Sequence, residues 1–450
     1  MRLNLLFILF FSIFISCSDE TVEVVESIEE ENTPDVDEEN PEEEPDTTTG
    51  SYELAGEVEL YNEDLIEDSY VLINDAGFNR VYLMNKENAE ILHEWELESG
   101  IGNDAELLDN GQLLVSLIDE NRQIGFGGYA GKIQIINPDN SIFWEYTISS
   151  DTEISHHDVE LLPNGNILVL VWEGKTIVDA KQNYGYVYDL DESIFAEKLV
   201  EINPQTNDIV WQWSAWDHFI QDQNDVLPNY GDISKNPNLI NINYRDVLQA
   251  SHNGDILHAN GLEYDAKNDL ILMSVNFYSE VWVVDHSTTT TEAATGAGGS
   301  YGLGGDLVYR FGNPEAYGNP EGSRSFYHNH GINIIPNTTR ALIYVNGGLN
   351  NNNDQSIVYE LQLPERYDLH ADADNELEQL WSFTDDNLFA PKVSSAFRLP
   401  NGNTLITEGD YGCWEVTADK QVVWKFKGKG FFWRAYPYQL DAEVLTNFDL

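Results

Sequence analysis

Few features of membrane-spanning, disulfide-linked or nucleic-acid-binding proteins are present in this sequence of 450 residues. Only two residues are cysteines, Cys17 and Cys413, which excludes a framework of several disulfide bonds. Lys and Arg together number 22 against 79 Asp and Glu, so the chain has a net charge of −57 and no basic surface for nucleic acid. The apolar run over residues 3–15 is too short to cross a bilayer as a helix. We therefore expect a large acidic protein without a nucleic-acid partner.

The first 17 residues have the pattern of a secretory signal peptide. Arg2 precedes the apolar run, which ends in an apolar pair, Ser16 and Cys17. This ending resembles the lipobox of bacterial lipoproteins, and the resemblance implies that Cys17 is lipidated. The alternative is ordinary cleavage beside an incidental cysteine. Lipidation would anchor an exported protein to the cell envelope, at the outer membrane, on either its periplasmic or its outer face.

Residues 18–50 are expected to be an acidic tether. They contain fifteen Asp and Glu, three prolines and no Lys or Arg. Such a segment repels itself and cannot bury a core, so we expect it to be disordered. No second linker of this kind follows, and residues 51–450 are predicted to form one domain.

The rest of the chain repeats two short patterns. The first pattern is a pair of apolar runs around Asn-Gly, which is a strong signal for a β-hairpin because both residues accept a positive φ. It occurs at 107–115, 161–169 and 397–406, with weaker copies at 262–273 and 332–344. In the second pattern, an apolar strand and a polar turn lead to an aromatic residue. The aromatic residues are Trp95, Trp144, Trp211, Trp381 and Trp424, and the sixth copy leads to Tyr309 and Phe311.

Six copies of a four-stranded unit, with few helical periods, predict an all-β fold, a six-bladed β-propeller. The repeated aromatic residues are expected to pack between blades. Residues 70–73 are expected to complete the last blade and close the ring, which removes exposed sheet edges. Two long insertions, 213–255 and 293–326, are expected to stand over one rim, where inserted loops commonly build a site.

Histidines precede the repeated hairpin strand in three blades. His156 and His157 lie before one copy, His258 before another and His330 before a third. Because the inner strand of every blade lines the central channel, we expect these imidazoles to converge there. His328 is two residues from His330, a spacing that places both rings on one face of a strand. The remaining histidines are interpreted as surface or loop residues: His93, His218, His252, His286 and His370.

Taken together, five segments resemble the bacterial arylsulfate sulfotransferases. They are residues 155–166, 257–260, 309–314, 326–330 and 397–406, and the similarity extends over about residues 70–438. The resemblance implies a six-bladed propeller that moves a sulfuryl group from an aryl sulfate to a phenol. It implies a ping-pong reaction through a sulfated histidine, without PAPS and without another cofactor.

The resemblance also implies roles for single residues. The family nucleophile matches His330, where the family has Gln-His and this chain has Asn329-His330. The family's other channel histidines match His157 and His258, and its following asparagine matches Asn260. We expect His258 and Asn260 to hold sulfuryl oxygens, and His157 to assist as a hydrogen-bond donor or as a general acid and base.

One departure from the family concerns its sulfuryl-binding arginine, because Asn276 stands in the corresponding place. An asparagine offers a neutral amide where arginine offers a charged fork, and the loss of one such donor can cost about a hundredfold in rate. Arg245, Arg310 or Arg324 are candidates for a replacement charge.

Two other functions fit the same residues. His328 and His330, with His157 or His258 and Asp158, offer ligands for a zinc ion in a metal-dependent hydrolase. Alternatively, the protein is a non-catalytic propeller that binds a glycan or a partner through the aromatic runs 301–317 and 431–436. Residues 350–354 offer oxygen atoms for calcium, although a solvated loop is the preferred interpretation.

Overall fold

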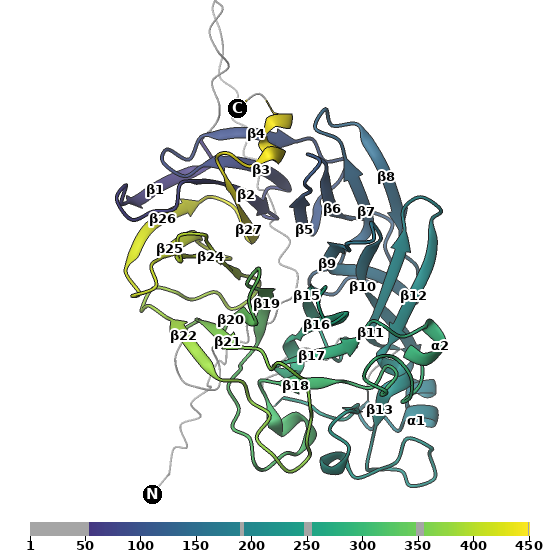
Figure 1. The fold of residues 1–450 in the computed structure, drawn as a ribbon. Coiled ribbons are helices and arrows are strands. Elements are labelled where there is room, and N and C mark those ends of the chain that lie inside the picture. The colour runs from purple at the N-terminus through teal and green to yellow at the C-terminus, as the bar shows by residue number, and fades with distance from the viewer. Residues whose placement is uncertain (1–53, 190–192, 247–253, 348–354, 449) are drawn as a thin grey trace, which may run out of the picture.

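The computed structural model describes residues 54–189, 193–246, 254–347, 355–448 and 450. It is a six-bladed β-propeller, as the repeats predict, with six antiparallel sheets arranged in a ring (Figure 1). The predicted signal peptide, Cys17, the tether, His252 and the loop 350–354 lie outside the described residues. Among the described residues, no helix has both the length and the apolar character needed to cross a bilayer.

Each blade runs outward from an inner strand beside the central channel (Figure 1). The first blade contains β27 (Phe432–Gln439), β2 (Ser69–Asp75), β3 (Arg80–Asn85) and β4 (Ile91–Trp95). The second contains β5 (Ile101–Leu107), β6 (Leu113–Ile118), β7 (Gly131–Ile136) and β8 (Ile142–Thr147). The third contains β9 (Glu153–Leu161), β10 (Ile167–Thr176), β11 (Ser193–Asn203) and β12 (Asp208–Ser214).

The other three blades follow in chain order. The fourth contains β15 (Ala259–Asp265), β16 (Leu270–Val275), β17 (Glu280–Asp285) and β18 (Tyr309–Phe311). The fifth contains β19 (Asn329–Ile334), β20 (Arg340–Val345), β21 (Ile357–Gln362) and β22 (Gln379–Phe383). The sixth contains β23 (Ser395–Arg398), β24 (Thr404–Glu408), β25 (Gly412–Val416) and β26 (Val422–Gly428), with β1 (Gly56–Tyr61) on its outer edge.

The five predicted hairpins are the first two strands of blades two to six. In the three Asn-Gly copies the turn glycine has a positive φ, at Gly111, Gly165 and Gly402. Only a residue that tolerates this conformation allows the tight turn between the inner strand and its neighbour. The hairpin prediction is therefore confirmed, but its physical reason holds for the glycine alone, because the asparagine before it does not have a positive φ.

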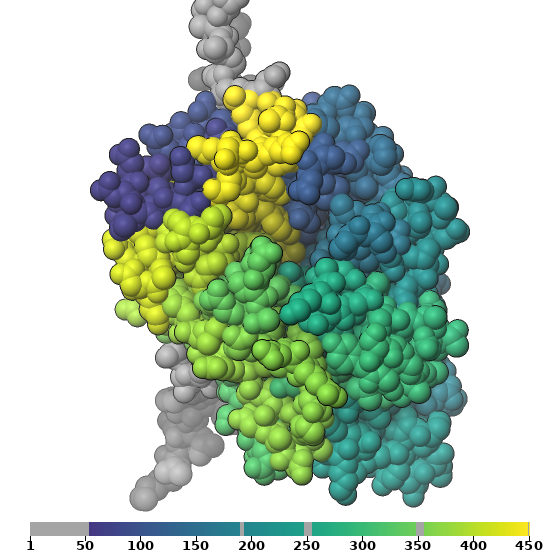
Figure 2. Space-filling view, in the orientation of Figure 1, coloured from purple at the N-terminus to yellow at the C-terminus, as the bar shows by residue number. Residues whose placement is uncertain are grey.

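The ring closes where the two ends of the described chain meet. β2 pairs with β27, with Tyr70 opposite Tyr438 and Leu72 opposite Tyr436. β1 pairs with β26 of the sixth blade. Figure 2 shows the C-terminal residues in yellow, seated between the purple N-terminal residues and the blue second blade. Residues 70–73 thus close the ring as predicted, but within the first blade, whose inner strand comes from the C-terminus.

The repeated aromatic residues join neighbouring blades, as predicted. Each of five donates a hydrogen bond to the following blade: Trp144 to Asn207, Trp211 to Thr288, Tyr309 to Asn375, Trp381 to Ala418 and Trp424 to Lys86. The Trp424 bond, 2.9 Å from Nε1 to the Lys86 carbonyl, joins the last blade to the first. Trp95 differs, because its ring packs against Phe448 near the C-terminus.

The two long insertions pack against each other at the outer side of blades three and four (Figure 1). They hold η1 (Ala215–His218), β13 (Phe219–Ile220), η2 (Ile233–Lys235), β14 (Ile240–Asn241), α2 (Thr290–Ala293) and η4 (Pro314–Tyr317). The indole of Trp213 donates to the Gly305 carbonyl over 2.7 Å, and Leu307 N donates to the Asn238 carbonyl over 2.9 Å. The other short helices are α1 (Ile177–Tyr184), η3 (Asn276–Tyr278) and η5 (Glu443–Asn447).

Replacing Trp424 with alanine tests the bond that closes the ring. Trp424 has no exposed surface, so we expect Trp424→Ala to lower the free energy of unfolding by about 3–5 kcal/mol through the cavity it leaves. Phe143→Ala is the control, because Phe143 lies on an outer strand and is 63% exposed; its effect should stay within about 0.5 kcal/mol. Chemical denaturation measures both changes, and equal losses would contradict the role of Trp424.

Candidate active site

Three histidines from three blades meet in the channel. The rings of His157 and His258 lie 4.8 Å apart, edge to face. The Trp433 ring lies 5.2 Å from the His157 ring and 6.2 Å from the His330 ring. All three imidazoles are buried, with no more than 4% of any residue exposed. The structure therefore brings together the three residues that the sequence singles out, although His157 and His330 are 173 positions apart.

A shared backbone corner turns these residues into the channel. His157, His258 and His328 have φ values of 54°, 53° and 55°, in the left-handed region that few residues other than glycine adopt. Asn276 N donates to the His258 carbonyl, and Asn346 N donates in the same way to the His328 carbonyl. His328 is therefore the equivalent of His258 in the next blade. Such corners cost free energy and persist where the surrounding packing holds them.

His330 differs from His157 and His258, because it comes two residues after the corner residue His328. In the fourth blade Asn260 holds that position, two residues after His258. Register shifts in the pairing follow both residues, between Ala259 and Gly261 and between His330 and Ile332. The register shift leaves β19 paired with β20 although the side chain of His330 reaches the cluster. His330 therefore joins the cluster from a position two residues after the corner, whereas His157 and His258 are themselves corner residues.

The contacts of His330 set its tautomer. Asn346 donates through Nδ2 to the carbonyls of Ala390 and Val393, over 2.8 Å and 3.0 Å. Its Oδ1 is therefore the atom that faces His330 Nδ1 and accepts a hydrogen bond from it. The lone pair of His330 is then on Nε2. Burial lowers the pKa of His330 to about 3, so the ring is neutral near pH 7. A neutral imidazole with a free lone pair is a competent nucleophile.

His258 and His157 are each held through Nδ1. Asp255 Oδ2 lies 2.6 Å from His258 Nδ1, and Asp255 Oδ1 also accepts the His258 backbone N–H. His157 Nδ1 lies 2.8 Å from Nδ1 of its neighbour His156. Burial, followed by the imidazoles of His258 and His156, holds the pKa of His157 well below its usual range. Among the described residues, no hydrogen bond occupies the other ring nitrogen, Nε2, of either imidazole.

The two asparagines expected to contact substrate are engaged with the protein. Asn260 Nδ2 donates to the Asn329 carbonyl over 2.9 Å. Asn276 Oδ1 lies 3.2 Å from His328 Nδ1, and its Nδ2 donates to the same Asn329 carbonyl over 3.2 Å. Asn276 therefore holds the histidine strand β19 in place. It does not point a free amide at a substrate, as the family arginine would.

Among the described residues, several buried polar atoms of this cluster have no hydrogen-bond partner. They include Nε1 of Trp433, Nε2 of His328 and Oδ1 of Asn260. A buried donor without a partner is costly unless a ligand satisfies it. From the sequence, Trp433 appeared only within the aromatic run 431–436 and not as a channel residue, because β27 is not followed by a hairpin of the repeated pattern.

The arginines proposed as replacements differ in position. The charge of Arg310 is neutralised by Glu280 in a fully buried pair. Arg245 stacks on the Tyr188 ring, 3.8 Å from its centre. Arg324 lies nearest the site, because its Nη2 donates to Ser279 Oγ, which also accepts the His328 backbone N–H. Arg324 is paired with Asp246.

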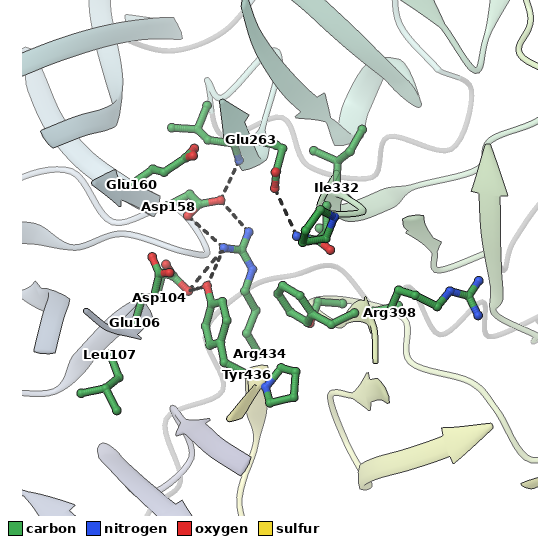
Figure 3. A pocket seen from close by; sticks show the side chains of 18 of the residues that line it. Asp104, Glu106, Leu107, Asp158, Glu160, Glu263, Ile332, Arg398, Arg434 and Tyr436 are labelled. Carbon is green, nitrogen blue, oxygen red and sulfur yellow. Dashed lines mark hydrogen bonds and ion pairs between the residues drawn. The ribbon is translucent and has the colours of Figure 1, made fainter. Parts of the chain in front are cut away.

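A cavity of about 450 Å³ occupies another part of the channel and is lined by all six inner strands (Figure 3). Its walls carry the carboxylates of Asp104, Glu106, Asp158, Glu160 and Glu263. Arg434 spans it and binds Asp158 with both Nη atoms (Figure 3). The three histidines do not line this cavity.

The carboxylates of this cavity make it unsuitable for an anion. Burial and the nearby Asp158 raise the pKa of Glu106 to about 7, and burial raises the pKa of Glu263 to about 8. These groups carry no positive charge in either protonation state, and the charge of Arg434 is taken up by Asp158 and Asp104. A sulfate ester therefore matches the histidine cluster better than it matches this cavity.

Two expectations about other residues are wrong. His218 is buried, not exposed, and lies 2.8 Å from both Asp306 Oδ1 and the Ala293 carbonyl. The aromatic runs do not form a binding surface, because most of their rings are buried: Tyr309, Phe311, Tyr317, Phe432 and Trp433. Most of these rings pack in the interior, and a sequence does not distinguish packed aromatic residues from exposed ones.

For the metal-site alternative, the described part of the chain holds no group of three or more His, Cys, Asp or Glu side chains placed to bind a metal ion. The closely spaced nitrogens of His156 and His157 face each other, with a hydrogen between them. His330 Nδ1 is likewise occupied by Asn346.

Comparison with known proteins gives one family match and several distant structural matches. The sequence model of the Arylsulfotransferase (ASST) family matches residues 82–430. No curated protein matches the chain. A solved protein of unknown function from Bacteroides caccae is 13% identical, with a TM-score of 0.48, and the match covers 83% of this chain and 100% of that one. The β-propeller domain of Cps50 (Swd1) from Myceliophteria thermophila is 9% identical, with a TM-score of 0.35, over 84% of this chain and 89% of that one.

The low pKa of His330, about 3, predicts how stability depends on pH. An unfolded histidine binds a proton near pH 6.5, so the stability from keeping His330 neutral is present above that pH. It is lost as the pH falls toward the folded value. We expect urea unfolding of His330→Asn to lose less stability between about pH 7 and pH 4 than the wild type does. The exposed His370 supplies the control His370→Asn, whose slope should match the wild type. A single slope for all three proteins would contradict a neutral, buried His330.

Proposed function

Because the chain belongs to the arylsulfotransferase family, we propose that it transfers a sulfuryl group from an aryl sulfate to a phenolic acceptor through a sulfated His330, without PAPS. The observation that supports this best is the neutral His330 with its lone pair on Nε2. The imidazoles of His157 and His258 belong to the same cluster and lie close enough to influence the charge of His330 or to be influenced by it.

The first half-reaction begins when His330 Nε2 attacks the sulfur of the donor. The new N–S bond forms as the bond from sulfur to the aryl oxygen breaks. The departing phenoxide takes a proton from His157 Nε2, a step that general-acid catalysis accelerates. The sulfated ring keeps its hydrogen on Nδ1, where Asn346 accepts it.

The second half-reaction runs in reverse with a new phenol. The phenol oxygen attacks the sulfur, the N–S bond breaks, and His157 Nε2 takes the phenolic proton. His258, whose Nδ1 donates to Asp255, would hold a sulfuryl oxygen through Nε2–H in its doubly protonated form, with Asp255 as the counter-ion. The first phenol leaves before the second binds, which is the kinetic pattern of a covalent intermediate.

The charge on the sulfuryl oxygens needs hydrogen-bond donors, since Asn276 replaces the family arginine. Trp433 Nε1 is buried without a partner, and the Trp433 ring lies near the rings of both His157 and His330. We assign it as one replacement donor. Donors already in place cost no reorganisation when negative charge develops in the transition state.

The export and anchoring of the protein are part of the same proposal. A signal peptide over residues 1–17, lipidation of Cys17 and the acidic tether 18–50 would place the propeller on the cell envelope. Sulfate esters and phenols arriving from outside the cell would then reach it without crossing the inner membrane.

The direct test is incubation of the purified protein with 4-nitrophenyl sulfate, with and without phenol. We expect phenol-stimulated release of 4-nitrophenol, and a loss on the order of a thousandfold or more in His330→Ala. The control is His286→Ala, since His286 is held by Glu201 and Asp269 outside the cluster; it should keep the activity. Loss of activity in EDTA would favour a metal-dependent hydrolase. An absence of release from the folded protein would favour a non-catalytic binding propeller.

The role of Trp433 is tested by Trp433→Phe, which keeps a ring but removes the N–H. We expect kcat to fall about a hundredfold, the usual cost of one oxyanion donor. Trp95→Phe is a matched control, because Trp95 Nε1 is also buried without a partner but lies on the outer strand β4. Steady-state kinetics that show no difference between the two variants would remove Trp433 from the mechanism.

A further inference from the structure

Behind His157 lies a buried chain of two more titratable groups. His156 Nδ1 is 2.8 Å from His157 Nδ1, and His156 Nε2 is 2.9 Å from Glu197 Oε2. Neither His156 nor Glu197 has any exposed surface. A proton on Glu197 can therefore reach the channel along these contacts through His156 and then His157.

The side chains of His156 and Glu197 have little freedom to rotate. The indole of Trp172 stacks on the His156 ring at 3.8 Å, with an angle of 3° between the planes. The other oxygen of Glu197, Oε1, accepts the backbone N–H of Ala259 over 2.7 Å. Rotation of either group would break one of these contacts, so protons are expected to move while the heavy atoms stay in place.

Each contact along the chain holds one hydrogen. Two Nδ1 atoms at 2.8 Å share a hydrogen that belongs to one ring or to the other. The same holds between His156 Nε2 and Glu197. Because a neutral imidazole carries one N–H, the position of the hydrogen at Glu197 determines the position of the hydrogen on His157.

We propose that Glu197, acting through His156, sets which ring nitrogen of His157 carries the hydrogen and stores the proton that the two half-reactions exchange. This inference rests on the proposed sulfuryl transfer and assigns Glu197 and His156 as positioning residues for it.

With Glu197 protonated, His157 is an acid. The carboxyl group donates to His156 Nε2, His156 Nδ1–H donates to His157 Nδ1, and the hydrogen of His157 is on Nε2, facing the channel. When Glu197 is ionised, its hydrogen is on His156 Nε2, which donates to the carboxylate, and His156 Nδ1 accepts a hydrogen bond from His157. His157 then carries its hydrogen on Nδ1, and its Nε2 lone pair is a base.

The proton balance of the reaction follows from these two states. When the departing phenoxide takes the hydrogen of His157 Nε2, His157 Nδ1 takes one from His156, and His156 Nε2 takes one from Glu197. The negative charge passes from the phenoxide to Glu197, and all imidazoles of the chain stay neutral. The incoming phenol then gives its proton to His157 Nε2, and the same shifts restore the carboxylic acid.

The surroundings favour the acid state before reaction. Burial, and then the nearby Asp255, raise the pKa of Glu197 well above its usual range. Burial also holds the pKa of His156 well below normal, against the opposing effect of Asp255. The other charged or titratable groups that face the chain are Asp158, His258, His330 and Arg434.

Glu197→Gln is the variant that tests the relay. The amide of glutamine can donate to His156 Nε2 and accept from Ala259, as the protonated carboxyl group does, but it cannot release the proton. We expect a loss of about a hundredfold with phenyl sulfate, whose basic leaving group needs an acid, and of less than about threefold with 4-nitrophenyl sulfate. A merely structural role would lower both rates equally, and that result would overturn the proposal.

Glu201→Gln is the matched control on the same strand, β11. Glu201 is also buried against a histidine, with its Oε2 3.1 Å from His286 Nε2, but it has no contact with His157. We expect both sulfate esters to react with this variant at wild-type rates. Equal leaving-group dependence in the two variants would overturn the proposal.

A second measurement does not depend on activity. In the wild type, ¹⁵N spectra of labelled histidines should show His157 with its hydrogen on Nε2, and on Nδ1 once rising pH ionises Glu197. In Glu197→Gln the Nε2–H form should persist over the same pH range. A His157 tautomer that responds to pH identically in both proteins would overturn the relay. If the wild type transfers sulfate from neither ester, the proposed function fails, and these spectra still decide on the relay.

Discussion

The pairing of β2 with β27 is the constraint on which the site depends. Side chains from blades three, four and five reach one point only if the ring closes, and the chain closes it by joining its two ends in one sheet. The closing strand also supplies Trp433 and Arg434, which lie beside the histidine cluster and within the carboxylate cavity. Stability and site geometry therefore have one physical origin, the completion of the first blade by the last strand.

The charge distribution separates two parts of the channel. The chain carries a net charge of −57, yet burial lowers the pKa of His156, His157 and His330 and so favours their neutral forms. The cavity lined by Asp104, Glu106 and Glu263 collects the buried acids, with Arg434 paired among them. A buried, polar cluster suits a reaction in which charge appears on sulfuryl and phenolic oxygens only briefly, because fixed donors act more strongly in a buried site than in water.

Prediction from the sequence succeeded where a tight turn needs a residue that tolerates a positive φ, as glycine does. The Asn-Gly turns identified three inner hairpins, since their glycine needs a positive φ, and two weaker copies of the same pattern identified two more. The same argument did not find β27, whose partner β2 is distant in sequence and needs no tight turn. The spacing of two residues placed His328 on the same strand face as His330, although His328 occupies the same left-handed corner position as His157 and His258.

The sequence by itself determined the six-fold repeat, the all-β class, the excess of acid and the histidines that enter the channel, because local periodicity and turn chemistry are written in adjacent residues. Only the tertiary structure decided what surrounds those histidines. Asn346 opposite His330, Trp433 near two imidazoles, and Glu197 behind His156 come from other strands or other blades. Their roles depend on distances of about 3 Å across the fold, and such distances are set by how the blades pack around the axis.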